Sequence, residues 1–300
     1  MESINKHRVV CFGEVLWDIL PSGAVPGGAP MNVAYHLHKQ KLNPALITKI
    51  GIDEEGKKLI NIFSNSGVCT DYFQVDYEYE TGKVYAKPNM QHDVSYDIAM
   101  PVAWDFIQWE DGLKELVDDA DFFVFGSLAA RNKVSADTLF SLLEIAKNKV
   151  LDINLRAPHF NKQAVSDLLL KADFVKMNQA ELELITGWFA DFSATEDRMK
   201  TLCERFSISN MVVTMGGDGS MLLMDGNLVS HKGFKVEVED TVGSGDAFLA
   251  GLLSKLLDND KPEEALDFAS RLGAFIATQR GACPEYEIQD IENLYHVPNL

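Results

Sequence analysis

The sequence is poor in cysteine and lacks any long apolar run. Its 300 residues include four cysteines, which are far apart in the chain: Cys11, Cys69, Cys203 and Cys283. This spacing disfavours a zinc knuckle and a dithiol redox centre, and isolated thiols are typical of a reducing compartment. The N-terminal segment lacks the apolar run of a signal peptide, and no stretch has the length of a membrane span. We therefore expect a cytoplasmic protein with no membrane partner.

Basic residues are scarce relative to acidic ones. Lysine and arginine number 27 against 45 aspartates and glutamates, which gives a formal net charge of −18. A protein that binds nucleic acid normally presents a basic face, and this chain has no run of lysine or arginine to form one. We therefore expect no nucleic-acid partner. A phosphorylated ligand must be held by backbone N–H groups, a few individual cations or a metal, because the overall field does not attract it.

Two sequence patterns alternate along most of the chain. Runs rich in β-branched and apolar residues predict buried strands at 8–12, 45–51, 121–127, 150–156, 173–178 and 210–216. Segments with apolar residues on one helical face predict helices at 30–41, 54–67, 137–149, 161–172, 180–187, 246–260 and 262–279. This alternation indicates an α/β fold in which helices cover both faces of a mostly parallel sheet. Apolar residues make up 46% of the sequence, which is enough for a sizeable core.

Two stretches depart from this alternation. Residues 14–26 include a half-exposed strand, and residues 70–103 contain short alternating segments around Thr81-Gly82, a pattern typical of a hairpin. We also expect a hairpin at 220–233 and a strand end at 236–240. Because no linker or internal repeat divides the chain, we expect residues 1–300 to form a single domain with a small antiparallel β insertion.

The segment DTVGSGDAFLAG (residues 240–251) places a glycine turn before an apolar helix. In open parallel sheets, ligands bind where strand ends meet helix N-termini. Gly243 and Gly245 carry no Cβ, so backbone N–H groups can converge there on an anion, and the helix dipole adds positive charge. Asp246 follows at once. If it faces a neutral hydroxyl while the N–H groups face a phosphate, it can act as the base that delivers an alcohol to a phosphoryl group.

Other interpretations of this segment compete with that one. A first-turn aspartate can simply compensate the helix dipole. A dinucleotide-binding turn requires G-x-G-x-x-G, and Phe248 stands in place of the third glycine. A Walker A loop requires G-K-[ST], which does not follow. The sequence therefore disfavours a nicotinamide oxidoreductase and favours an anion hole with a neighbouring base.

DTVGSGDAFLAG resembles the C-terminal signature of the PfkB/ribokinase family of carbohydrate kinases. Other segments resemble further motifs of that family in the same order: CFGEVLWD, GGAPMNVA, DINLR, KMNQAELE, VVTMGGDGSML and ATQRGACP. GGAPMNVA and DINLR resemble the forms found in fructokinases. The resemblance implies a three-layer αβα ribokinase-like fold with a mostly parallel central sheet and a small antiparallel β lid, formed by about residues 14–26 and 70–103.

The implied activity is ATP-dependent phosphorylation of a sugar hydroxyl, with D-fructose converted to fructose 6-phosphate. Ribokinase, 2-keto-3-deoxygluconate kinase and nucleoside kinase are alternatives within the same family. A sugar- or nucleotide-sensing pseudokinase is the non-enzymatic alternative, and the intact Asp246, Asn178 and Glu181 argue against it. The lid is expected to close over the sugar, because water is a competing acceptor, and to supply the contacts of a homodimer.

By the same resemblance, Asp246 is the catalytic base. The backbone N–H groups that form the anion hole belong to Gly243, Ser244 and Gly245. Arg156 is expected to reach phosphate oxygens with its forked donors, supported by Asp152 and Asn154. An ion pair with a surface acid is the structural alternative for this arginine.

The residues expected to bind the sugar are Asp18, Gly27, Gly28 and Asn32. A carboxylate such as Asp18 accepts hydrogen bonds from a polyol, although a solvated acid at a strand end has the same sequence. The two glycines allow the substrate to approach the backbone. Asn32 can donate to hydroxyls and accept from them.

The residues expected to bind ATP are Thr214, Gly216, Gly217, Asp218, Gly219, Asn178, Gly245 and Ala277. Without the resemblance, GGDG is an ordinary tight turn. Asn178 and Glu181 are expected to organise Mg²⁺ through its water molecules. A helix cap with a first-turn acid satisfies the same N-x-x-E spacing. Asp240 lies in the segment expected to bind K⁺.

Two features concern stability or packing instead of chemistry. Lys41 occupies the place where the family usually has a glycine at a left-handed helix cap, and this conformation costs a lysine about 1 kcal/mol. His36 and His38 are two residues apart on a predicted helix and face different directions. We therefore expect core or surface histidines and no metal pair.

Overall fold

The computed structural model of the protein describes residues 8–20, 23–88, 94–190 and 194–296. Within these residues, a central sheet has nine strands in the order β13-β12-β11-β10-β9-β8-β1-β4-β5. Its strands, in chain order, are β1 (Val9–Phe12), β4 (Ala45–Gly51), β5 (Phe73–Asp76), β8 (Phe122–Gly126), β9 (Lys149–Asp152), β10 (Phe174–Asn178), β11 (Asn210–Thr214), β12 (Ser220–Met224) and β13 (Asn227–His231). The pairs from β11 to β5 are parallel, and β12 and β13 complete the sheet as the antiparallel hairpin predicted at 220–233.

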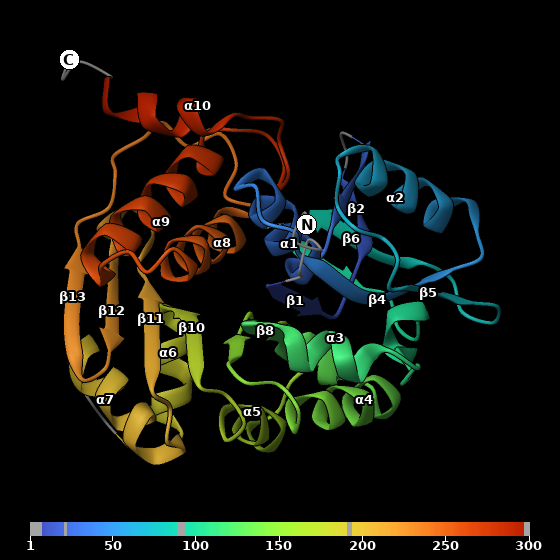
Figure 1. Cartoon of the computed structure of the whole chain (residues 1–300), viewed down its shortest axis with the longest axis horizontal. Coiled ribbons are helices and arrows are strands. Elements are labelled where there is room, and N and C mark those ends of the chain that lie inside the picture. The colour runs from blue at the N-terminus through green and yellow to red at the C-terminus, as the bar shows by residue number, and fades with distance from the viewer. Residues whose placement is uncertain (1–7, 21–22, 89–93, 191–193, 297–300) are drawn as a thin grey trace, which may run out of the picture.

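Helices cover both faces of this sheet (Figure 1). One layer contains α1 (Ala29–Lys39), α2 (Glu54–Asn65), α8 (Ser244–Leu257), α9 (Pro262–Ala277) and α10 (Ile288–Glu292). The opposite layer contains α3 (Leu113–Asp119), α4 (Lys133–Leu143), α5 (Lys162–Leu169), α6 (Gln179–Gly187) and α7 (Thr195–Phe206). The predicted three-layer αβα fold with a mostly parallel sheet is therefore confirmed.

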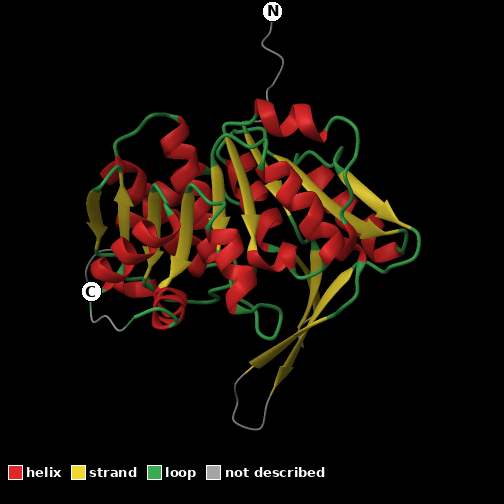
Figure 2. Cartoon of the chain, turned by 90° about the horizontal axis from the view of Figure 1, so that it is seen from below, coloured by secondary structure: helices red, strands yellow, loops and turns green. Residues whose placement is uncertain are grey.

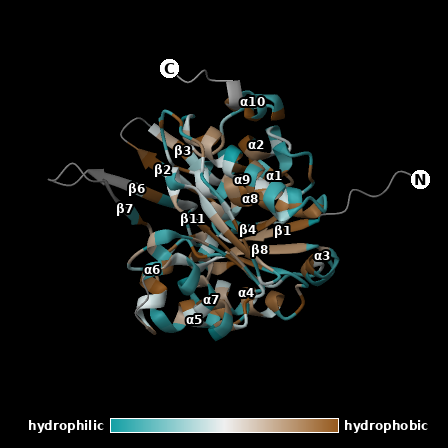
Figure 3. Ribbon diagram, turned by 90° about the vertical axis from the view of Figure 1, so that its left-hand side faces the viewer, coloured by the Kyte–Doolittle hydropathy of each residue, from teal (hydrophilic) through white to brown (hydrophobic). Residues whose placement is uncertain are grey.

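The strand β1 shows why the sheet needs both layers. Val9 and Cys11 pack into the core on one face, whereas Val10 and Phe12 pack into the core on the other. Because successive side chains of a strand point to opposite faces, a run that is apolar at every position has to be covered twice. Figure 3 shows the same hydrophobic character along β1, β4 and β8 in the interior. Among the described helices, none is long and apolar enough to cross a membrane.

A second, smaller sheet has the order β3-β2-β6-β7 among the described residues and is called the small sheet below. It is built from β2 (Leu16–Leu20), β3 (Gly23–Gly27), β6 (Gly82–Pro88) and β7 (Val94–Ile98). β6 and β7 extend from the body as a two-stranded arm (Figure 2). The outer pairs are antiparallel, as predicted, but β2 and β6 run parallel, with Leu16 opposite Gly82.

Several predicted boundaries are wrong. Residues 73–76 pair with β4 as the edge of the central sheet, so the insertion begins near residue 82 and Thr81-Gly82 is not a hairpin turn. Asp76 accepts the N–H groups of Glu78 and Tyr79, which turns the chain at the end of β5. Residues 236–240 are not a strand, because the N–H groups of Glu239 and Asp240 donate to the carbonyl of Ala277.

Two other boundaries shift because of local backbone signals. The strand predicted at 150–156 ends at Asp152, and Asn154 has a left-handed φ of 38°. The helix predicted at 137–149 begins at Lys133, because the Asn132 side chain accepts the N–H of Val134 and caps it. Lys41 has a left-handed φ of 63°, the conformation for which the family usually has a glycine at this place.

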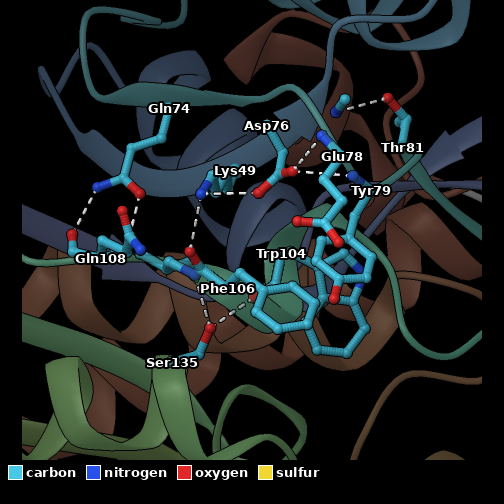
Figure 4. Close-up of polar contacts among 12 residues, drawn as sticks. Lys49, Gln74, Asp76, Glu78, Tyr79, Thr81, Trp104, Phe106, Gln108 and Ser135 are labelled. Carbon is cyan, nitrogen blue, oxygen red and sulfur yellow. Dashed lines mark hydrogen bonds and ion pairs between the residues drawn. The ribbon is translucent and has the colours of Figure 1, made fainter.

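The chain that leaves the arm is tied to the edge of the central sheet by buried polar contacts (Figure 4). Lys49 Nζ lies 2.8 Å from the Asp76 carboxylate and donates to the carbonyl of Phe106 at 3.1 Å. The Gln74 side chain donates to the Gln108 carbonyl at 2.6 Å and accepts the Gln108 N–H at 2.9 Å. These contacts join β4 and β5 to the segment that follows β7.

A second buried ion pair joins Asp105 of this segment to Arg131, which follows β8. Arg131 donates to both carboxylate oxygens of Asp105, at 2.6 and 2.9 Å, and the N–H of Val102 donates to the same carboxylate. The two side chains are 2% and 0% exposed. We call Asp76, Lys49, Asp105 and Arg131 the arm-base cluster. Its carboxylates are fully paired, so its role in the structure is to anchor the arm.

Candidate active site

The predicted functional residues gather at the carboxyl ends of the parallel strands, where open α/β sheets bind ligands. Asn178 ends β10 and is in register with Thr214, which ends the neighbouring strand β11. Asp246 lies in the first turn of α8, which follows the glycine turn. Arg156 lies in the loop after β9. The topology therefore brings together residues that are far apart in the sequence.

The turn before α8 has no room for a side chain at one position and little room at a second. Gly243 has φ 77°, and a Cβ there would lie 2.6 Å from Cα of Ala282. A Cβ on Gly245 would lie 3.0 Å from Nζ of Lys176. Ser244 donates its hydroxyl to the carbonyl of Gly273 at 2.7 Å, which ties the turn to α9. The backbone therefore approaches its surroundings closely at the N-terminus of α8, where the helix dipole favours an anion.

Asp246 is held by one side chain from the helix α1. Asn32 Nδ2 donates to Asp246 Oδ2 at 2.7 Å, and Oδ1 accepts no hydrogen bond from the described residues. Burial raises the pKa of Asp246 to about 6, although Lys176 and Arg156 act to lower it. A carboxylate with a pKa near neutrality and a free oxygen is suited to accept a proton.

Asp18 on β2 faces the first glycine of the di-glycine turn. A Cβ on Gly27 would lie 2.2 Å from Asp18 Oδ2, so glycine is required for this approach. Burial raises the pKa of Asp18 to about 6, the Arg156 charge lowers it, and the charges of Asp240 and Asp246 raise it. Asp18 and Asp246 therefore share one electrostatic environment, with Arg156 as a cation common to both.

Arg156 itself is exposed, and its Nη1 donates to the carbonyl of Leu155 at 3.2 Å. Its charge lowers the pKa of Glu14, Asp18 and Asp246. Arg156 therefore lies close enough to these three carboxyl groups to act on their ionisation. Its contact with phosphate stays a prediction.

Sequence reasoning missed Glu14, which lies beneath the di-glycine turn. Its side chain is buried, Oε1 accepts the Ala29 N–H at 3.3 Å, and Oε2 is buried without a partner among the described residues. Gly28 has φ 120°, and a Cβ there would lie 2.4 Å from the Glu14 carbonyl oxygen. Burial raises the pKa of Glu14 to about 7. The signal in the sequence that could have identified Glu14 is an acidic residue just after a buried strand, in CFGEVLWD.

Sequence reasoning also missed Lys176, a cation beneath the glycine turn. Its ammonium lies 2.9 and 2.8 Å from the two carboxylate oxygens of Asp152, and both side chains are buried. Burial alone would lower the pKa of Lys176, but the charges of Asp152 and Asp246 more than offset this and raise it. The lysine is therefore charged. A lysine inside the buried strand DFVKMN was the signal, because an unpaired ammonium is rarely buried.

Asn178 and Glu181 form the helix cap that was the structural alternative for N-x-x-E. The Asn178 side chain accepts the Glu181 N–H, and Glu181 Oε2 accepts the Asn178 N–H, both at 2.9 Å. Glu181 Oε1 accepts the Leu155 N–H at 2.8 Å. Among the described residues, no group of three or more His, Cys, Asp or Glu side chains could hold a metal ion. Side-chain oxygen atoms that already accept hydrogen bonds are suited to contact Mg²⁺ through its water molecules. This role of Asn178 and Glu181 stays a prediction.

The glycine turn after β11 lies on the same edge of the sheet. Residues Gly216–Asp218 form a single 3₁₀ turn after Thr214. Gly219 has φ 100°, and a Cβ there would lie 1.9 Å from the His231 carbonyl oxygen. Gly217 has open space around its Cβ position. The turn therefore has the tight geometry and the location expected of a nucleotide-binding loop, while its ligand stays a prediction.

Asp240 and Ala277 organise the loops around the end of α9. The Ala277 carbonyl accepts the N–H groups of residues 239 and 240. Asp240 accepts the N–H of Val242 at 3.0 Å through Oδ1 and the N–H of Gly281 at 3.2 Å through Oδ2. Both carboxylate oxygens thus bind backbone. The predicted K⁺ and adenine contacts at these residues are not tested by this geometry.

The sequence matches one protein-family model and several known proteins. A model of the "pfkB family carbohydrate kinase" matches residues 22–289. Fructokinase-1 of Oryza sativa subsp. japonica is 30% identical over 309 residues, which cover 93% of this chain and 94% of the rice protein. Probable fructokinase-7 of Arabidopsis thaliana is 29% identical over 315 residues, which cover 95% of this chain and 91% of that protein.

Solved structures share the fold. The fructokinase of Vibrio cholerae O395, in its fructose-, ADP- and calcium-bound form, has a TM-score of 0.82 at 24% identity and covers 97% of this chain and 99% of its own. The ATP-bound fructokinase of Xylella fastidiosa has a TM-score of 0.84 at 22% identity and covers 95% of this chain and 97% of its own. At these identities the likeness shows the fold, and it agrees with the αβα layers and the small sheet described above.

Proposed function

The chain belongs to the pfkB family of carbohydrate kinases, and from this premise we propose that it phosphorylates D-fructose with ATP to give fructose 6-phosphate and ADP. The observation that carries the proposal is the carboxylate of Asp246. It lies in the first turn of α8, its Oδ2 is held by Asn32, and its Oδ1 is left free by the described residues. A base in this position is next to the amides that can bind a transferring phosphoryl group.

In the proposed reaction, Asp246 Oδ1 takes the proton of a sugar hydroxyl. The hydroxyl oxygen then forms a bond to the γ-phosphorus of ATP while the bond from that phosphorus to the β,γ-bridging oxygen breaks, and ADP leaves with that electron pair. The N–H groups of Gly243–Gly245 and the buried charge of Lys176 stabilise the negative charge on the phosphoryl oxygens. Arg156, at the mouth of the site, is the second cation available to them.

The sugar is proposed to lie between the di-glycine turn and α8. Asp18 accepts hydrogen bonds from its hydroxyls, and Gly27 and Gly28 let it approach the backbone. Asn32 has a second role besides the predicted one, because its amide nitrogen donates to Asp246. We therefore assign Asn32 to holding the base, with its second N–H left for the sugar.

ATP is proposed to lie along the same sheet edge, from the Gly216–Gly219 turn to the anion hole. Thr214 and Asn178 stand side by side at the ends of β11 and β10, and Ala277 lies behind the loop that carries Asp240. Mg²⁺, when bound, neutralises charge on the phosphate groups. The residues that would hold it through water are Asn178 and Glu181. K⁺ beside Asp240 is a further part of the proposal.

Fructose is distinguished from the other family substrates by a coupled assay of ADP release. Purified protein is tested with fructose, ribose, 2-keto-3-deoxygluconate and adenosine, each with Mg-ATP. We expect fructose to have the highest kcat/KM. A higher kcat/KM for another sugar or nucleoside would change the assigned substrate and leave the mechanism in place. If none of the four compounds causes ADP release, the proposed function is wrong.

We also propose that the small sheet forms a homodimer contact. β3 and β7 are its edge strands in the described part of the chain, and such edges offer unpaired backbone groups to another strand. Tyr85 on β6 is 40% exposed, which adds an apolar surface to this arm. Sedimentation equilibrium at micromolar concentration is expected to give the mass of two chains. The mass of one chain at all concentrations would contradict the proposal.

A further inference from the structure

The amide of Asn32 is held on both sides. Its Nδ2 donates to Asp246 Oδ2 at 2.7 Å, and its Oδ1 accepts the thiol of Cys283 at 3.3 Å. Asn32 is buried, and α1 and α8, which carry Asn32 and Asp246, pack side by side in one layer (Figure 1). A continuous chain of hydrogen bonds therefore runs from Cys283 through Asn32 to Asp246.

The chemistry of the two outer groups determines which way the amide faces. An ionised carboxylate only accepts hydrogen bonds, so it requires the NH₂ end of the amide. A thiol can donate, so it is satisfied by the carbonyl end. Burial raises the pKa of Cys283 well above its usual range, and the charge of Asp246 acts in the same direction. The thiol therefore keeps its proton and can remain the donor at the pH of the reaction.

The segment that carries Cys283 is itself fixed by α1. His36 lies within 2.8 Å of the Ala282 carbonyl through Nε2 and within 3.0 Å of the Tyr286 hydroxyl through Nδ1. Burial lowers the pKa of His36 to about 4, so its Nε2–H donates to the carbonyl and its Nδ1 accepts from the hydroxyl. Tyr35 donates its hydroxyl to the Pro284 carbonyl at 2.7 Å. Both neighbours of Cys283 are thus held.

We propose that Cys283 is a positioning residue for the phosphoryl transfer, which acts through Asn32 by holding its amide with the NH₂ end toward Asp246. The inference rests on the proposed function, because it assigns a role relative to the proposed base. It differs from a packing role in one respect: the role belongs to the thiol hydrogen and not to the volume of the side chain.

This role has a direct consequence for the ionisation of Asp246. The hydrogen bond from Asn32 favours the charged carboxylate and lowers its pKa against the effect of burial. Without the thiol donor the amide can rotate, so that the carboxylate loses part of this stabilisation. The other charged groups that act on Asp246 stay in place: Lys176 on β10, Asp152 on β9, Arg156 in the loop after β9, Glu14 after β1 and Asp18 on β2.

The test compares three substitutions that separate hydrogen bonding from volume. Cys283→Ser keeps a donor in a smaller side chain, Cys283→Val removes the donor at similar volume, and Cys283→Ala removes both. We expect Cys283→Val and Cys283→Ala to raise the apparent pKa of the acid limb in the pH profile of kcat/KM for fructose by about 0.5 unit. At pH values below this pKa, kcat/KM should fall by about three-fold, and KM for ATP should not change. Ser should keep the wild-type limb.

A second arm tests whether Cys283 acts through Asn32. In an Asn32→Ala background, Cys283→Ala should cause no further shift of the limb, because the chain of hydrogen bonds is already broken. Thermal denaturation of every variant confirms that the assayed protein is folded. A purely structural cysteine would show the opposite pattern: Ser and Ala would lose activity together through the void that they leave, and Val would be tolerated.

The outcomes separate this inference from the proposed function. If wild-type protein phosphorylates fructose but all three variants keep its acid limb, or Ser and Ala shift it equally, the positioning role is wrong and the kinase assignment stands. If wild-type protein phosphorylates none of the panel substrates, the proposed function fails first. A limb shifted in Val and Ala, retained in Ser and absent from the double variant supports the inference.

Discussion

Two groups of carboxylates in this molecule are treated in opposite ways. At the arm base, Asp76 pairs with Lys49 and accepts two backbone N–H groups, and Asp105 pairs with Arg131 through two hydrogen bonds. At the carboxyl edge of the sheet, Asp246 accepts one hydrogen bond from Asn32, while Glu14 has a buried oxygen without a partner among the described residues.

The pKa values follow this difference. Burial alone would raise the pKa of Asp76, but the hydrogen bonds from Lys49 and from backbone N–H groups more than offset it and lower the pKa. Burial raises the pKa of Asp246 to about 6 and that of Glu14 to about 7, because their partners are too few to compensate. A carboxylate that is fully paired stabilises the fold, whereas one that is left underpaired is ready to exchange a proton.

The strongest test of this comparison replaces one aspartate by asparagine in each of the two groups. Asp246→Asn should lower kcat by about 10³-fold, because an amide cannot take the hydroxyl proton. The new side chain can still accept from Asn32, so the dissociation constants for ATP and fructose should stay within about two-fold. Initial rates and isothermal titration calorimetry measure the two effects. Turnover close to that of wild type would show that another group is the base.

Asp76→Asn is the matched control at the arm base. It should leave the buried Lys49 without its counter-charge and lower the free energy of unfolding by about 3 kcal/mol, measured by urea denaturation. The kcat of the folded fraction should stay close to wild type. A loss of kcat comparable to that of Asp246→Asn would remove the distinction between the two groups.

The next largest effect is expected at Lys176, which is paired like the arm base but lies in the active site. Lys176→Met should lower kcat by about 10²-fold, because the cation beneath Gly245 is lost, and should also destabilise the protein, because Asp152 is left buried and unpaired. In Lys176→Met with Asp152→Leu, the melting temperature should recover while kcat does not. Recovery of kcat together with stability would show that the lysine is only structural.

The smallest effect concerns stability and its pH dependence. The pKa of Asp246 is raised in the folded state from an ordinary value of 3.8 to about 6, so the folded protein binds the proton more tightly than the unfolded chain. The contribution of this group is therefore most favourable below pH 4 and is lost as the pH rises through 6. Asp246→Asn should be more stable than wild type by on the order of 1 kcal/mol at pH 8, and about equal at pH 4. Urea denaturation at the two pH values measures the difference, and equal stability at pH 8 would mean that the underpaired carboxylate carries no cost.

The alternation of apolar runs with helical segments was sufficient to predict the three layers, because the strands β1, β4 and β8 are buried on both sides and carry the signal in their own residues. It was not sufficient for the edges. The sequence of β5 was interpreted as part of the insertion, because only its pairing with β4 makes it the edge of the central sheet. The VEVED segment was interpreted as a strand, but its N–H groups donate to the end of α9.

The same distinction applies to the active site. Asp246 and its glycine turn are recognisable from one short segment. The partners of Asp246 are not, because Asn32 lies 214 residues away in the sequence and Cys283 contacts Asn32 across 251 residues. Lys176 and Glu14 are visible in the sequence as charges beside buried strands, but their roles depend on Gly245 and Gly28, which the fold brings against them.

The most direct test of Asp246 as an underpaired base is the pH dependence of a single turnover with fructose. With enzyme in excess over ATP, the rate of fructose 6-phosphate formation should fall below an apparent pKa near 6, with a slope of one, and Asp246→Asn should lack this limb at its much lower rate. A wild-type rate that stays constant down to pH 5, or a limb that persists unchanged in Asp246→Asn, would contradict the account.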